Sequence, residues 1–206
     1  MPKFPHPPSR LAIPAIIKVL PAGTRLWRVY FAAGAHPGAW NAFRFFGPTT
    51  SRFDHHDLPR SVQAKGILYG ATDPVTCLAE VSQATRVIDR HSGQPWLGGF
   101  DTALGLTLLD LSGTWPTQAG ASMAINSGPR PRAQAWSRLI SATYSTIDGI
   151  YYPSSMHANA PSVALYERAH ARGVMPGAPV FNRALSDRAL ASRLGAAAQL
   201  LGFSII

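Results

Sequence analysis

One segment constrains the fold of this chain more than any other: an apolar run followed directly by a helix start. Residues 66–71 (Gly-Ile-Leu-Tyr-Gly-Ala) have the character of a buried strand, and Thr72-Asp73-Pro74 form a turn after it. Asp73 suits the cap of a helix and Pro74 its first position, so we expect a helix from Pro74 to about Arg90. A strand that leads into a helix in this way is typical of a mixed α/β domain.

The same segment carries two residues with chemical potential, Tyr69 on the strand and Glu80 on the helix. They stand 11 positions apart, a spacing that lets both face one cleft. An aromatic plate beside a lone carboxylate suits a flat cationic ring attached to a sugar, and the nicotinamide riboside part of NAD is such a group. The alternative is a half-buried sheet tyrosine and a solvated helix glutamate.

Further strands and helices follow from the periodicity along the chain. Thr24–Phe31 alternates as a strand in which Arg28 is the one polar residue among large apolar ones, and residues 34–65 form a long irregular excursion with short strands. We also expect strands at 103–111, 150–152, 180–181 and 203–206, and helices at 132–146, 162–173 (capped by Ser162) and 187–201.

Length and charge narrow the class of protein. With 206 residues, 46% hydrophobic and 14% charged, the chain suits one compact domain. Its net charge of +9 attracts polyanions, but the basic residues are spread along the chain, with Arg130 and Arg132 among the few close pairs. No zinc-finger, RNP-like or basic-zipper pattern accompanies the charge, which argues against direct nucleic-acid binding.

The compartment follows from cysteine usage and the N-terminus. A single cysteine, Cys77, excludes an internal disulfide, fits a reducing cytoplasm and is expected to be a buried packing thiol. The proline-rich start lacks the apolar core of a signal peptide. The apolar run 11–20 is too short to span a bilayer, so we expect residues 1–23 to form an N-terminal arm, no membrane contact and a cytoplasmic protein.

Four short motifs occur in a known order: Arg28 in Leu-Trp-Arg-Val-Tyr, Tyr69 in Ile-Leu-Tyr-Gly-Ala, Glu80 in Leu-Ala-Glu-Val and Ser154 in Tyr-Tyr-Pro-Ser-Ser. Together they resemble the RES domain family over roughly residues 24–185. The resemblance implies a single domain at 24–206 like the ADP-ribosyltransferases, with a central split sheet flanked by helices. It also implies a toxin of a bacterial toxin–antitoxin pair that consumes NAD, uses no metal and is neutralised by a cognate antitoxin protein.

The site residues have defined expected roles. Cleaving the nicotinamide–ribose bond passes through a cationic sugar, which the Glu80 carboxylate can stabilise while Tyr69 stacks on nicotinamide. Arg28 suits the pyrophosphate, and Ser154 a phosphate or ribose hydroxyl. The family has a Gly-Arg-Trp motif where this chain has Ser51-Arg52-Phe53, so Arg52 is a further candidate for NAD binding.

Alternatives remain open for both residues and function. Arg28 can instead pair with an interior carboxylate such as Asp110, and Ser154 can merely cap a turn after Pro153. The neighbouring Asp54, His55, His56 and Asp57 are interpreted as a polar loop and not as a metal site, because adjacent ligands seldom converge on one ion.

The acceptor of the ADP-ribose group also stays open. Water and phosphate are the first candidates, and the alternative is mono-ADP-ribosylation of a cellular protein. A basic module that binds nucleic acid without catalysis ranks third, with nucleic acid otherwise reached only through the antitoxin.

Overall fold

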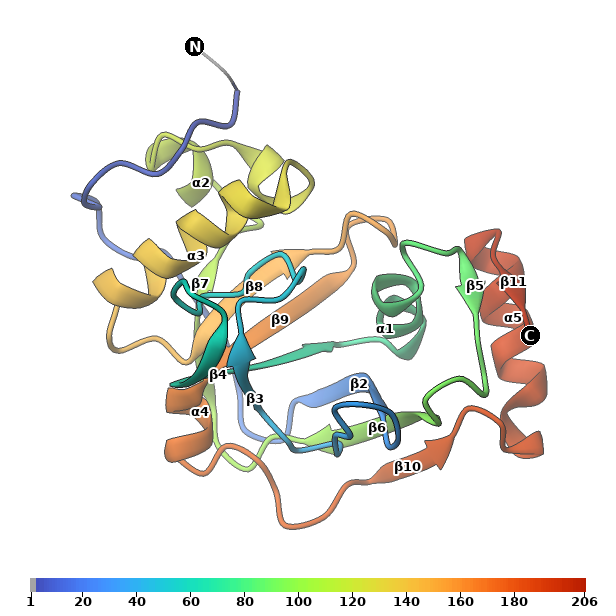
Figure 1. Ribbon diagram of the computed structural model, residues 1–206. Coiled ribbons are helices and arrows are strands. Elements are labelled where there is room, and N and C mark those ends of the chain that lie inside the picture. Colours follow the sequence, from blue (N-terminus) through green and yellow to red (C-terminus); the bar gives the residue numbers. More distant parts are fainter. Residues whose placement is uncertain (1–2) are drawn as a thin grey trace.

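The computed structural model describes residues 3–206 as a mixed sheet with helices packed on it (Figure 1). Met1 and Pro2, the first residues of the predicted arm, lie outside the described residues. The main sheet contains nine strands: β1 (Ile17–Leu20), β2 (Arg25–Phe31), β3 (Arg44–Gly47), β4 (Ser61–Ala71), β6 (Pro95–Asp101), β7 (Leu106–Asp110), β8 (Gly149–Pro153), β9 (Pro161–Tyr166) and β10 (Phe181–Ala184).

The remaining elements are helices and a small parallel sheet. The α-helices are α1 (Pro74–Val81), α2 (Trp115–Gln118), α3 (Arg130–Thr143), α4 (Glu167–Ala171) and α5 (Ala191–Leu201), and the 3-10 helices are η1 (Met123–Asn126) and η2 (Arg188–Leu190). β5 (Val87–Ile88) pairs with β11 (Ser204–Ile205). None of the helices within residues 3–206 is long and apolar enough to cross a membrane.

The main sheet is split at its middle. Its strand order is β1-β7-β8-β9-β4-β2-β6-β10, with β3 paired to β4 as a branch. A single residue pair, Trp27 with Ala71, joins β4 to β2, whereas β2 and β6 pair over seven residues. A Cβ on Gly70 would lie 3.0 Å from the Trp27 carbonyl oxygen, so this glycine permits the close crossing. The predicted mixed α/β fold with a split sheet is therefore confirmed.

Separate apolar clusters hold the two halves of the sheet. α3 covers the half that contains β7, β8 and β9, where Trp136 and Ile140 pack against Leu109 and Ile150 (Figure 1). α1 and α5 lie beside the other half, where Leu78 and Leu194 meet the β6 side chains. A third buried cluster, with Leu26 and Phe100 from one half and Leu68 and Leu108 from the other, joins the two halves.

Two predictions of secondary structure are wrong, one in the type of element and one in the residue at which a helix ends. The helix expected from Ser162 is instead strand β9 followed by the short helix α4, because Val163, Ala164 and Leu165 are fully buried between β8 and β4. The helix expected to reach Arg90 ends at Val81. Beyond it Arg86 takes a left-handed φ of 56° and the chain enters β5.

Other predictions are confirmed. Asp73 caps α1 by accepting from the backbone N–H groups of Val75 and Thr76, and Pro74 stands at its start. The strands predicted near 24–31, 103–111 and 150–152 are present as β2, β7 and β8. β6 was not predicted, because its two glycines and its proline weaken the strand pattern. The predicted boundary between an arm at 1–23 and a catalytic domain at 24–206 stays a prediction.

Gly149 supplies a test of the packing between β8 and β9. Its φ is 157°, and a Cβ there would lie 2.1 Å from the Ala164 carbonyl oxygen. We therefore expect Gly149→Ala to lower the free energy of unfolding by about 3 kcal/mol or more, measured by urea denaturation. Gly195, an exposed helix position with no atom near its added Cβ, is the control. Gly195→Ala should raise stability by about 0.5–1 kcal/mol, and equal effects of the two variants would contradict the packing argument.

Candidate active site

A cleft opens where β2 and β4 diverge from the Trp27–Ala71 pair. Its volume is about 670 Å³, within the range of sites that bind cofactor-sized ligands. Side chains from β2, β4, the end of α1, the loop after β2 and the segment around 126–130 line it. Four of the predicted site residues line this cleft together: Arg28, Arg52, Tyr69 and Glu80.

Ser154 does not line the cleft but lies directly behind Glu80. Its hydroxyl donates to Glu80 Oε1 at 2.5 Å and accepts from the backbone N–H groups of Met156 and His157 at 3.1 and 3.2 Å. The side chain is fully buried. Because the two N–H donors occupy the oxygen, its proton has to point at the carboxylate, so Ser154 fixes the orientation of Glu80 and also caps the turn.

Arg28 projects from β2 into the cleft. Within residues 3–206 its hydrogen-bond partners are main-chain carbonyl oxygens, those of Ala42 at 2.9 Å and Trp40 at 3.3 Å. Asp110, the possible partner considered from the sequence, binds Ser112 instead. Burial lowers the pKa of Arg28 to about 10, so the guanidinium remains charged at neutral pH. The charge is held by neutral groups and is available to an anion.

Arg52 and Arg130 place two more guanidinium groups in the cleft. Arg52 donates to the Gly128 carbonyl oxygen at 2.6 Å, and Arg130 donates to Gln83 Oε1 at 2.7 Å. Burial and the nearby charge of Arg130 both lower the pKa of Arg52. Neither arginine forms an ion pair with a carboxylate in residues 3–206. These two like charges, held close together, favour an anionic ligand.

Sequence reasoning missed several cleft residues. Arg130 stood out only as part of a basic pair, Gln83 and Asn126 lay in no motif, and Tyr152 was quoted only as part of the motif that carries Ser154. Asn126 is buried, and its side-chain NH₂ donates to the Leu111 carbonyl oxygen at 3.0 Å. That contact fixes the amide orientation, since a carbonyl can only accept. Asn126 Oδ1 therefore remains as an acceptor without a partner among the described residues.

The aromatic hydroxyls and the thiol of the cleft are neutral at physiological pH. Burial raises the pKa of Tyr69 and of Tyr152 above the ordinary tyrosine value, and the nearby Glu80 charge adds to the effect on Tyr152. Burial likewise raises the pKa of Cys77, whose Sγ donates to the Trp27 carbonyl oxygen at 2.9 Å. Glu80, in contrast to these hydroxyls and this thiol, brings a carboxylate that can stabilise a developing cation.

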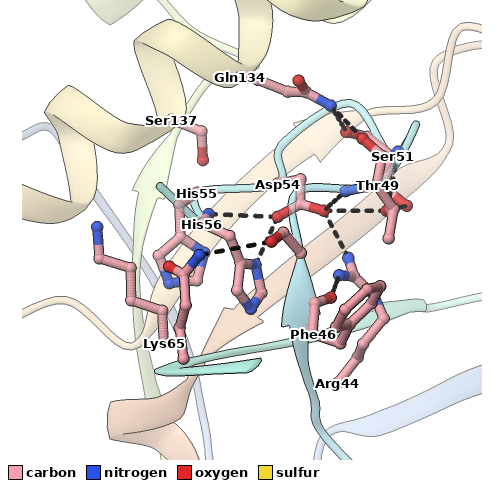
Figure 2. A network of polar contacts seen from close by, with 12 residues as sticks. Arg44, Phe46, Thr49, Ser51, Asp54, His55, His56, Lys65, Gln134 and Ser137 are labelled. Carbon is pink, nitrogen blue, oxygen red and sulfur yellow. Dashed lines mark hydrogen bonds and ion pairs between the residues drawn. The ribbon is translucent and has the colours of Figure 1, made fainter. Parts of the chain in front are cut away.

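A buried carboxylate joins Arg44, on β3, to the loop that follows and carries Arg52 (Figure 2). Asp54 is fully buried; its Oδ2 accepts from Arg44 Nη2 at 2.8 Å and from the Thr49 N–H at 2.6 Å, and its Oδ1 accepts from His56 Nδ1 at 2.6 Å. Despite burial, these hydrogen bonds and the Arg44 charge lower the pKa of Asp54. The charge of Arg44 is thus neutralised within the protein, unlike that of Arg28.

The two histidines have structural partners. His55 and His56 lie in the predicted polar loop, and both side chains are fully buried. His55 Nε2 donates to Glu167 Oε2 at 3.0 Å, and burial lowers the pKa of His55. In residues 3–206 no cluster of three or more His, Cys, Asp or Glu side chains could hold a metal ion.

Comparisons with known proteins concern the family and the fold of the chain. A family model described as "RES domain" matches residues 25–187. A search of curated proteins finds no match. The solved structure of the M. tuberculosis MbcT–MbcA toxin–antitoxin complex contains a chain with a similar fold, at 19% identity and a TM-score of 0.54, and the match covers 86% of this chain and 92% of that one.

The Asp54 anchor predicts a pH-dependent contribution to stability. A carboxyl whose pKa is lowered by folding stabilises the protein above its unfolded pKa, near 4, and loses that contribution as the pH falls. We expect Asp54→Asn to cost about 3 kcal/mol at pH 7, because Arg44 would lose its buried counter-charge. The difference from the wild type should shrink below about pH 4, measured by denaturation at several pH values.

A matched control is Asp57→Asn, which removes an exposed carboxylate paired with Lys65 at 2.7 Å. Its effect should stay within about 0.5 kcal/mol at every pH. An Asp54→Asn variant as stable as the wild type at pH 7 would contradict the anchoring role.

Proposed function

The chain belongs to the RES domain family, and from this we propose that it is the toxin of a toxin–antitoxin pair that cleaves the nicotinamide–ribose bond of NAD in the cleft at the sheet split. The observation that carries the proposal is the charge arrangement of the cleft. Three guanidinium groups that form no ion pair with a carboxylate among residues 3–206 line the same cleft as one oriented carboxylate, Glu80.

The charges of the cleft complement those of NAD. The dinucleotide has two negative phosphates and one cationic ring, and the cleft offers positive charge from Arg28, Arg52 and Arg130 and negative charge from Glu80. Arginine pairs well with phosphate because its planar donors match the oxygen geometry. The pyrophosphate would bind the arginines, and the nicotinamide riboside would lie against Glu80 with Tyr69 and Tyr152 as the aromatic wall.

Catalysis would depend on charge stabilisation. As the C1′–N bond breaks, its electron pair goes to the nicotinamide nitrogen, which leaves as a neutral ring, and positive charge develops on the ribose. The Glu80 carboxylate would stabilise that cation, and a nucleophile would then bond to C1′ and release its proton. Ser154 would act through Glu80 by holding the carboxylate in one orientation, so we propose it as a positioning residue.

The partner and the domain limits belong to the same proposal. The similar structure is that of a toxin bound to an antitoxin, and this chain would be neutralised in the cytoplasm by an antitoxin of its own. Residues 24–206 would form the catalytic domain. Expression of the chain alone should stop bacterial growth, and co-expression of the antitoxin should restore it; growth unaffected by the chain alone would contradict a toxin.

Three incubations test the activity and its acceptor. Purified protein with NAD should release nicotinamide, and no release with or without phosphate would overturn the proposed function. Release in buffer alone indicates water as the acceptor, and strong stimulation by phosphate indicates phosphorolysis. Labelled NAD in a cell lysate tests transfer to protein, which would appear as label in a discrete band.

Glu80→Gln is the central test of the chemistry. The substitution keeps the size of the side chain and its acceptor for Ser154 but removes the negative charge. We expect kcat for NAD consumption to fall at least about tenfold while the melting temperature stays close to that of the wild type. Full activity in this variant would show that the carboxylate is not the catalytic group. Asp57→Asn, on an exposed carboxylate outside the cleft, is the control and should retain activity.

Ser154→Ala separates orientation from charge. The variant keeps the Glu80 carboxylate but removes the donor at 2.5 Å, so kcat should fall on the order of tenfold. Two backbone N–H groups also lose their acceptor, which should lower stability by about 1–3 kcal/mol. Ser154→Thr, which retains the hydroxyl, should recover part of the activity. An unchanged kcat in Ser154→Ala would contradict the positioning role.

A further inference from the structure

We infer that Phe4, near the N-terminus, is a positioning residue of the active site. Its ring packs on Gly128 and fixes the position of that residue. The Gly128 carbonyl oxygen in turn orients Arg52 toward the anionic part of the substrate. The inference rests on the proposed function for the identity of that substrate. It concerns the N-terminal segment, which runs beside α2 and α3 in Figure 1.

Phe4 is held firmly in its place. Its side chain is 4% exposed and belongs to the core cluster under α3. Arg132 donates to the Phe4 carbonyl oxygen and lies over its ring at 5.8 Å, and Trp136 Nε1 donates to the Pro5 carbonyl oxygen at 2.9 Å. These contacts make the segment a fixed part of the α3 face and not a loose tail.

The Phe4 ring lies directly on Gly128. A Cβ added to Gly128 would stand 2.8 Å from Phe4 Cδ1 and 2.7 Å from the Ala124 carbonyl oxygen, so the glycine is enclosed on both sides. The Gly128 N–H donates a hydrogen bond to the Ala124 carbonyl oxygen at 2.6 Å. The short segment between η1 and α3 is therefore clamped between the N-terminal segment and η1.

One hydrogen bond connects Gly128 to the cleft residue Arg52. Gly128 accepts from Arg52 Nη1 at 2.6 Å, and this carbonyl is the acceptor that orients the guanidinium within residues 3–206. Arg52 forms no ion pair there: the nearby charge of Arg130 repels it, and the charge of Glu80 attracts it more weakly. If Gly128 shifts, Arg52 loses the hydrogen bond that sets its orientation, so a change at Phe4 should weaken the binding of phosphate groups.

The experiment measures binding and turnover separately. ADP-ribose carries the pyrophosphate without the reactive ring, and its affinity is measured by calorimetry for wild type, Phe4→Ala, Arg52→Ala and the double variant. We expect Phe4→Ala to lower this affinity about fivefold and to raise the KM for NAD similarly, with kcat changed less than about twofold. In the Arg52→Ala background the same substitution should have no further effect.

Two further variants control for misfolding and for a general loosening of the N-terminal segment. Phe4→Leu keeps apolar bulk and should show a smaller loss of affinity; it also provides the measurement if Phe4→Ala does not fold. Tyr144→Phe removes the hydrogen bond of Tyr144 to the Ile13 carbonyl oxygen, at 2.8 Å, elsewhere along the same N-terminal segment. It loosens the segment without touching Gly128 and should leave the affinity for ADP-ribose unchanged.

The outcomes are distinct. Unchanged affinity in both folded Phe4 variants, an equal loss in Tyr144→Phe, or a full additional loss in the Arg52→Ala background would each overturn the inference. If the wild-type protein binds ADP-ribose but releases no nicotinamide from NAD, the proposed function is wrong. The affinities of the Phe4 variants for ADP-ribose would still test whether Phe4 positions Arg52. Wild-type protein that does not bind ADP-ribose would overturn the clamp's proposed ligand.

Discussion

The single pairing of Trp27 with Ala71 is the constraint on which the rest of the structure depends. One residue pair keeps β2 and β4 in one sheet, and beyond it the strands diverge and leave backbone and side chains facing a cleft. Gly70 allows the crossing because any larger residue would press on the Trp27 carbonyl. A buried apolar cluster that contains Leu26 and Phe100 from one half and Leu68 and Leu108 from the other still joins the two halves. A site can therefore exist where an ordinary sheet would have continuous pairing.

A second requirement is that loops without regular structure carry charges at fixed positions. The buried Asp54 accepts hydrogen bonds from Arg44 on β3 and from Thr49 and His56 in the loop that follows it. These contacts join the loop that carries Arg52 to the sheet through one carboxylate. A loop that looked irregular in sequence thus has a defined attachment beside the cleft.

The sequence predicts those parts of the site that have local causes. Asp73-Pro74 determines where α1 begins, and the strand before it places Tyr69, so the pairing of Tyr69 with Glu80 in one cleft follows from short-range signals. The family resemblance adds Arg28 and Ser154. The contacts of Ser154 with Glu80, of Arg130 with Gln83 and of Asn126 with Leu111 join residues 74, 47 and 15 positions apart, which no local pattern encodes. The β9 strand was mistaken for a helix for the same reason, since pairing on both sides decides its conformation.

The arginines of the cleft show how binding and stability are related in this protein. Arg44 is neutralised internally and serves the fold, whereas Arg28, Arg52 and Arg130 are held by carbonyl and amide oxygens that orient them without cancelling their charge. The charges of Arg52 and Arg130 repel each other, and a bound anion would relieve that repulsion. In the proposed site, the Gly128 carbonyl and the Gln83 amide would therefore contribute to affinity by positioning these charges, and the packing of Phe4 on Gly128 would contribute in the same way.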